Sequence, residues 1–228
     1  MPDKEMLQYY LDHVLGENDK FKFSCKQCES CCRNRAEAVV ITGVDIYYMA
    51  KELEITPHEF VRNNTHINIG PSSRLPVVSL AERLDGSCRM LRNGKCMVHK
   101  SKPSVCAIYP LGRMVINGGD HFSYFTQENC CPGCYGAEEH TVKEWVGSFN
   151  LEQRDPECIR WNKLLDKMAH FMIKYEKKMS DEIKEVIHKT MFVLLYVGYD
   201  TDKSLIDEIE KAETGFDRMI ELYETVFN

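Results

Sequence analysis

The run Cys25-Lys26-Gln27-Cys28-Glu29-Ser30-Cys31-Cys32 places four cysteines within eight residues. Gaps of two residues allow consecutive thiolates to converge on one metal centre, and few other uses of cysteine need this spacing. Packing does not explain the run, because a buried free cysteine acts only as a small apolar side chain. The run therefore predicts that the protein binds metal through thiolates.

Most of the other cysteines extend this cluster along the first part of the chain. Ten of the eleven cysteines lie between Cys25 and Cys134. Beyond the first run, the members are Cys88, Cys96, Cys106, Cys130, Cys131 and Cys134. They suffice for two four-cysteine sites, or for one site with spare thiols. The sequence leaves open the number of centres, the pairing of the ligands and the roles of Cys130 and Cys134.

The spacing also bears on which metal is bound. Thiolates are soft ligands that suit zinc, copper(I) and iron–sulfur clusters. Structural zinc sites usually pair two C-x-x-C motifs, whereas Cys25, Cys28 and Cys31 repeat the ferredoxin spacing. Cys131-Pro132 adds a cysteine next to a proline, which ferredoxins also have, although about a hundred residues later in this chain. We therefore expect one or two [4Fe–4S] clusters, with structural zinc as the alternative.

Two further residues are expected to lie outside the ligand set. His99 follows Cys96 by three residues, and we expect it to be a surface residue or a hydrogen-bond donor near the site. Cys158 stands alone in a helical pattern near Trp161, and we expect it in the hydrophobic core.

Composition and charge restrict the class of protein. The 228 residues carry a net charge of −6, which argues against a nucleic-acid-binding surface. The charge is uneven, with 16 basic and 15 acidic side chains in residues 1–134 but 13 and 20 in residues 135–228. The N-terminus shows no secretory signal pattern, and no stretch approaches the ~18 apolar residues of a membrane span. We expect a cytoplasmic protein that binds neither membrane nor nucleic acid, with a redox or other protein as its partner.

The first 138 residues combine short helices with β-hairpins. Thr56-Pro57-His58-Glu59 is a strong helix-start signal, and Thr42 with Asp45 is a second. Asn93-Gly94 is a strong hairpin signal, and a second hairpin turn is expected at 117–120. The expected helices are 3–15, 43–54 and 57–63, and a strand is expected at 76–80. The hairpins would present Cys88, Cys96 and Cys106 at strand ends and turns.

From about residue 139 onward the pattern becomes helical. The expected helices are 140–150, 157–178, 181–198 and 203–227. Ser180 is a good N-cap for the third, because acidic side chains follow it in the first turn. The sequence thus predicts an α+β protein, with a cysteine-rich metal-binding domain at 1–138 and a C-terminal helical region at 139–228 packed on it.

These motifs resemble a known family over residues 21–135. The matching segments are the Cys25–Cys32 run, Val44-Asp45-Ile46 with Leu53, Glu59-Phe60, Cys88, Cys96-Met97-Val98-His99, Lys102-Pro103 with Cys106, Tyr109-Pro110 and Cys131-Pro132-Gly133. Together they resemble the YkgJ-type cysteine-cluster proteins, the CxxCxxCC family of zinc- or iron-chelating domains. Ala107 departs from the family pattern, which usually has arginine there.

The resemblance implies a ligand set and one possible activity. The implied metal ligands are Cys25, Cys28, Cys31, Cys32, Cys88, Cys96, Cys106 and Cys131. The family includes flagellin lysine N-methylases that use S-adenosylmethionine, so a methyltransferase-like activity is a further alternative. The sequence shows no glycine-rich strand-to-helix turn to hold such a methyl donor. It identifies no catalytic residue, and whether the protein is an enzyme stays open. We expect a redox or electron-transfer role, or an enzymatic step that a cluster supports.

Overall fold

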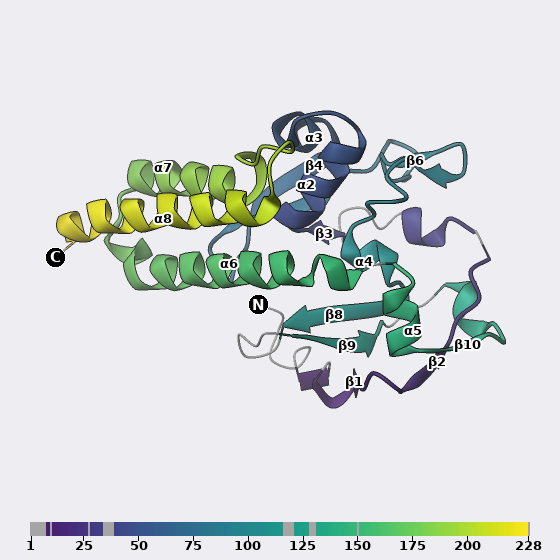
Figure 1. Ribbon diagram of the computed structural model, residues 1–228. Helices are drawn as coiled ribbons and strands as arrows, with labels where there is room; N and C mark the ends of the chain where they lie inside the picture. Colours follow the sequence, from purple (N-terminus) through teal and green to yellow (C-terminus); the bar gives the residue numbers. More distant parts are fainter. Residues whose placement is uncertain are drawn as a thin grey trace.

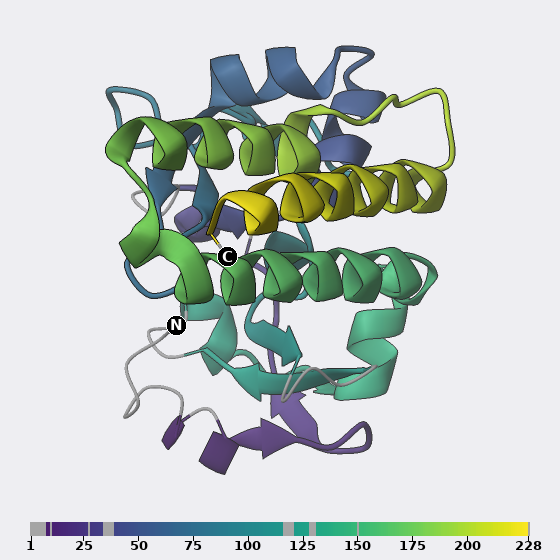
Figure 2. The same ribbon diagram turned by 90° about the vertical axis from the view of Figure 1, so that its left-hand side faces the viewer.

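The computed structural model describes residues 8–9, 11–26, 28–33, 39–115, 121–127, 131–149 and 151–227. It confirms the α+β class: small antiparallel sheets and short helices lie beside a group of long C-terminal helices (Figures 1 and 2). The long helix α6 (Asp155–Tyr175) lies between α8 (Leu205–Phe227) and the β8–β9 hairpin in both views. None of the helices that the structure describes is both long and apolar enough to cross a membrane.

Two short helices begin where the sequence predicts. Helix α2 (Gly43–Glu52) starts after Thr42, and α3 (Pro57–Asn64) starts after Thr56. Each threonine hydroxyl accepts a hydrogen bond from the backbone N–H three residues on. The carboxylate of the acidic residue at that position accepts a hydrogen bond from the backbone N–H of the threonine. These reciprocal bonds satisfy backbone donors that the first helical turn leaves free.

The short helices pack on a three-stranded antiparallel sheet. Its central strand is β5 (Pro76–Leu80), as predicted, and its edges are β3 (Val40–Ile41) and β4 (Thr65–Ile69). The sequence did not indicate β3 or β4. Strand β3 has only two residues, too few for a period-2 pattern. Strand β4 does alternate Ile67 and Ile69 with polar His66 and Asn68, but over only five residues, and it is mostly exposed.

Both predicted hairpins are present. Strands β6 (Leu91–Arg92) and β7 (Lys95–Cys96) flank Asn93 and Gly94, which have φ values of 51° and 74°. Positive φ at both central positions is the geometry for which Asn-Gly is favoured. Strands β8 (Leu111–Val115) and β9 (Phe122–Thr126) form the second hairpin, whose predicted turn at 117–120 lies outside the described residues.

The N-terminal prediction is only partly correct. Of the helix expected at 3–15, residues 8–9 and 11–12 are helical, whereas residues 1–7 and 10 lie outside the described part. Val14–Leu15 is instead strand β1, paired with β9. Pairing with a strand distant in sequence overrides the local helical pattern there. Strand β2 (Lys20–Lys22) pairs with β10 (Glu139–Thr141).

Three of the four predicted C-terminal helices are found, whereas the helix predicted at 140–150 is shorter, because its first two residues pair with β2 as part of strand β10. Helix α5 is Val142–Gly147 and α7 is Asp181–Phe192, capped by Ser180 as expected. A π-helical turn, η6 (Val193–Val197), continues α7. The short 3₁₀ turns are η1 (Ser30–Cys32), η3 (Pro132–Tyr135), η4 (Leu151–Gln153) and η5 (Glu176–Lys178), and a one-turn helix α4 spans Ser104–Ala107.

Two apolar clusters hold these elements together. The larger joins α2, α3 and β5 to α6, α7 and α8. The smaller joins Phe21, Phe23, Ile108 and Leu111 to the turns around α5. Residues from both sides of position 138 contribute to each cluster. The proposed boundary between 1–138 and 139–228 stays a prediction.

Candidate metal centre

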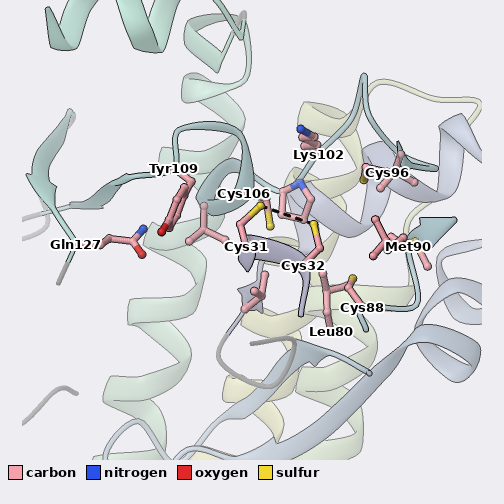
Figure 3. A pocket seen from close by; sticks show the side chains of 15 residues that line it. Cys31, Cys32, Leu80, Cys88, Met90, Cys96, Lys102, Cys106, Tyr109 and Gln127 are labelled. Atoms are coloured by element: carbon pink, nitrogen blue, oxygen red, sulfur yellow. Dashed lines mark hydrogen bonds between the residues drawn. The ribbon is translucent and has the colours of Figure 1, made fainter. Parts of the chain in front are cut away.

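Five of the predicted ligands line one cavity. They are Cys31, Cys32, Cys88, Cys96 and Cys106. The cavity has a volume of about 130 Å³, and Figure 3 shows these cysteines around it. They come from three segments of the chain, residues 31–32, 88–96 and 106, which the fold brings together.

Local backbone geometry positions the thiols of Cys31 and Cys32 at the cavity. Glu29 has a φ of 59°, and this left-handed residue starts the 3₁₀ turn η1 that carries Cys31 and Cys32. The backbone N–H of Cys88 donates to the carbonyl of Cys32 over 2.8 Å. A bridge between Arg33 and Ser87 extends this pairing. The first cysteine run is therefore fastened to the segment that carries Cys88.

The other two cavity cysteines sit on separate elements. Cys96 ends strand β7 of the Asn-Gly hairpin. Cys106 lies in α4, whose first residue, Ser104, donates its backbone N–H to the buried carboxylate of Asp45 over 3.0 Å. The same carboxylate caps α2. Asp45 therefore links the α2 start to the turn that carries Cys106.

Arg83 holds the loop that carries Cys88, and the sequence alone did not single it out. Its guanidinium donates to the carbonyls of Cys88 at 2.7 Å, Leu91 at 2.8 Å and Arg89 at 2.7 Å. A planar group with five donors suits such a multiple contact. A basic residue five positions before a candidate ligand is too common a pattern to have signalled this role.

The thiols face a shared space and do not meet at a point. The Sγ atoms of Cys31 and Cys32 are 3.8 Å apart. Among the described residues, no three Cys, His, Asp or Glu side chains converge closely enough to hold a single ion. The remaining cavity thiols are spread around the walls (Figure 3).

The environment of the cavity favours protonated thiols when no cation is present. Most of its other lining residues are apolar, including Leu80, Met90 and Val98. Burial raises the pKa of the Cys106, Cys88 and Cys96 thiols. The pKa of Cys32 is raised first by its hydrogen bond with Cys31 and then by burial. A bound metal cation would reverse this preference, because thiolates are the ligating form.

Residues 24–132 match the CxxCxxCC family, described as "Putative zinc- or iron-chelating domain". The matched segment is just under half of the 228 residues. No curated protein and no solved structure matches the chain significantly. The family match and the thiol-lined cavity agree on a metal-binding role, and the donor set is of the soft thiolate type that zinc and iron–sulfur centres use.

The three other predicted ligands of the CxxCxxCC domain do not line this cavity. Cys28 lies beside Cys131, and hydrogen bonds from the Ser30 hydroxyl and backbone, followed by one from Cys131, lower its pKa. Cys131 is buried, whereas Cys25 is exposed. The structure thus separates Cys28 from Cys31, because the left-handed turn at Glu29 directs them to different surroundings.

The additional cysteines and His99 have different positions. Cys134 is disulfide-bonded, and Cys130 lies outside the described residues. His99 is exposed and does not line the cavity. Cys158 is buried in α6, as predicted, with its pKa raised to about 12 by burial. It does not line the cavity of the CxxCxxCC domain and so provides a natural comparison for the cavity thiols.

Proposed function

We propose that the CxxCxxCC domain binds an iron–sulfur cluster, of the [4Fe–4S] type, in the five-thiol cavity, and that the protein exchanges electrons with a partner. The observation that carries the proposal is the arrangement of five thiols around one space, with no tight group of three among the residues that the structure describes. A single ion needs its donors within bonding distance of one point. A cluster takes each thiolate on a different iron, so its ligands stand further apart.

The surroundings of the thiols support an electron-transfer role. Cys31 is exposed, whereas Cys88 is buried. A group held between them would be shielded by apolar walls on one side and would lie near solvent on the other. When bound, a cluster with all irons held by cysteine would supply one-electron chemistry. The exposed side is where a partner would approach.

Zinc is the second candidate, and one distance favours it. A tetrahedral zinc site with Zn–S bonds of about 2.3 Å has neighbouring sulfur atoms about 3.8 Å apart. Cys31 and Cys32 have this separation. In that case the domain would be a structural module that binds partners. The methyltransferase alternative rests on the family resemblance alone.

Chemical analysis of protein purified without oxygen separates these candidates. We expect about four irons and four acid-labile sulfides per cluster, with absorption near ~400 nm that bleaches on reduction with dithionite. A colourless protein that contains zinc and no sulfide would overturn the cluster proposal and establish the zinc module in its place.

A further inference from the structure

The segment that carries three of the cavity cysteines is strongly basic. From Gly86 to Gly119 the chain has six basic side chains and no acidic one. The six are Arg89, Arg92, Lys95, Lys100, Lys102 and Arg113. This imbalance occurs in a protein whose net charge is −6. The side chain of Arg113 is buried and forms an ion pair with Asp155 at 2.7 Å, so the other five cations make the segment a positive region on an acidic molecule.

Several of these cations point into solvent without an acidic partner. Arg92, Lys95 and Lys100 are exposed, and within the described part of the chain none of the three forms an ion pair. Many basic residues elsewhere are paired. Examples are Lys174 with Glu224 at 3.2 Å and Lys203 with Asp200 at 3.0 Å. The charge of the segment is thus available to a partner.

The unpaired cations lie next to the thiol cavity. Arg92 and Lys95 flank the turn of the β6–β7 hairpin, which projects from one edge of the molecule (Figure 1). Cys96 follows Lys95 directly, and its thiol lines the cavity. At the hairpin tip, a Cβ on Gly94 would lie 3.2 Å from a carboxylate oxygen of Glu29, so the tip adjoins the first cysteine run.

Lys102 connects this surface to the cavity itself. It is partly buried and, among the described residues that line the cavity, it is the only lysine or arginine. Figure 3 shows it on the cavity wall, across from Cys88. Positive charge therefore extends from the cavity wall to the exposed hairpin.

We infer that the β6–β7 hairpin surface, which carries Arg92 and Lys95 and is followed along the chain by Lys100, is a docking surface for an acidic protein. Opposite charges steer such a partner to the part of the surface nearest the thiols. If the proposed function holds, on which this part of the inference rests, the partner is an acidic one-electron carrier. A bound cluster would take up the one electron that the reduced carrier loses, with no transfer of a proton or other group.

Other anionic partners fit the structure less well. An extended nucleic acid would meet the acidic remainder of the molecule, where residues 135–228 hold 20 acidic and 13 basic side chains. A second copy of this chain would have to offer those same acidic side chains. Several of them are already engaged within the chain, as Glu224 is with both Lys174 and Tyr175. A separate acidic protein meets neither difficulty.

The test measures binding of a defined acidic probe, a plant-type [2Fe–2S] ferredoxin, to the intact protein by calorimetry. We expect binding at ~20 mM salt that weakens at least tenfold at ~300 mM salt, because exposed charges are screened. The double variant Arg92→Glu/Lys95→Glu should weaken binding at least tenfold at low salt while its metal content stays unchanged. Cytochrome c, a basic electron carrier, should not bind.

A matched control makes the same charge change elsewhere. Lys177→Glu/Lys178→Glu alters two exposed residues of η5, beyond the far end of α6, and should bind the ferredoxin like the wild type. The inference is overturned if the two double variants behave alike or if the wild type does not bind at low salt. It is also overturned if the hairpin charges instead drive binding of duplex DNA or self-association in sedimentation runs.

Failure of this inference differs from failure of the proposed function. Binding is measured independently of metal content. Ferredoxin binding by a protein that contains only zinc would keep the docking surface and remove the electron-transfer role. A protein that contains a [4Fe–4S] cluster but shows no charge-dependent binding would keep the proposed cluster and remove the docking surface.

Discussion

The backbone N–H of Cys131 donates a hydrogen bond to the hydroxyl of Tyr109 over 2.8 Å. Tyr109 lines the five-thiol cavity, whereas Cys131 lies outside it beside Cys28. This bond therefore joins the two groups of cysteines that the CxxCxxCC domain contains.

Replacing Tyr109 tests this connection. Tyr109→Phe keeps the ring but removes the acceptor, leaving the N–H of the buried residue Cys131 unpaired. A buried donor without a partner costs about 1–3 kcal/mol, so we expect the free energy of unfolding in urea to fall by an amount in this range. Tyr135→Phe, at an exposed tyrosine, is the control. Equal free energies of unfolding for the two variants would show that this hydrogen bond does not stabilise the fold.

Arg83 is expected to act on metal binding through the loop that it holds. Arg83→Ala removes the donors to three carbonyls of residues 88–91 and should weaken metal retention against a chelator at least several-fold. Arg62→Ala, at an exposed position of α3, should leave retention unchanged. Arg83→Ala should also lower the thermal unfolding temperature slightly, whereas its main effect should be on metal retention. Unchanged retention in Arg83→Ala would mean that Cys88 is positioned without it.

Gly43 is required by the close approach of α2 to the C-terminal helices. A Cβ at this position would clash with the carbonyl oxygen of Leu195, which accepts a 2.9 Å hydrogen bond from the indole of Trp161. Overpacking of this kind typically costs about 1–3 kcal/mol, and Gly43→Ala should lower stability by at least that amount. Gly147→Ala, where a Cβ meets nothing within 4 Å, should be neutral or slightly stabilising. The prediction is checked by comparing the urea unfolding midpoints of the two variants with that of the wild type.

Glu157 gives a pH dependence whose sign follows from its surroundings. Burial raises its pKa, although the Tyr48 hydroxyl donates to it over 2.8 Å. A carboxyl whose pKa is higher in the folded state favours folding at acidic pH, and this contribution is lost as the pH rises through its folded value. Glu157→Gln should therefore gain stability relative to the wild type between acidic and neutral pH. The free energies of unfolding of the variant and the wild type are measured in urea at acidic and neutral pH. A stability difference between them that is the same at both pH values would contradict this.

Local signals predicted the parts of the fold that short segments decide by themselves. Asn93-Gly94 and the two threonine caps act within four residues, and the structure has the turn and both helix starts where they indicate. Strand β1 was missed because it exists only through its pairing with β9, more than a hundred residues away.

The candidate site shows the same division between local and distant effects. The spacing of Cys25, Cys28 and Cys31 indicated metal binding, but spacing does not reveal that a left-handed turn at Glu29 separates Cys28 from Cys31. The convergence of Cys88, Cys96 and Cys106 on Cys31 and Cys32 depends on the tertiary fold. The roles of Arg83 and Tyr109 depend on contacts that no motif in the sequence encodes.

The most direct test of the central claim compares a cysteine inside the cavity with one outside it. Cys106 lines the thiol cavity, whereas Cys158 is buried in α6 outside it. Iron and acid-labile sulfide are measured in Cys106→Ala, Cys158→Ala and the wild type, all purified without oxygen. We predict that Cys106→Ala loses most of its iron and sulfide while Cys158→Ala retains the wild-type amounts. Equal metal and sulfide in the two variants would contradict the assignment of the five-thiol cavity as the metal centre.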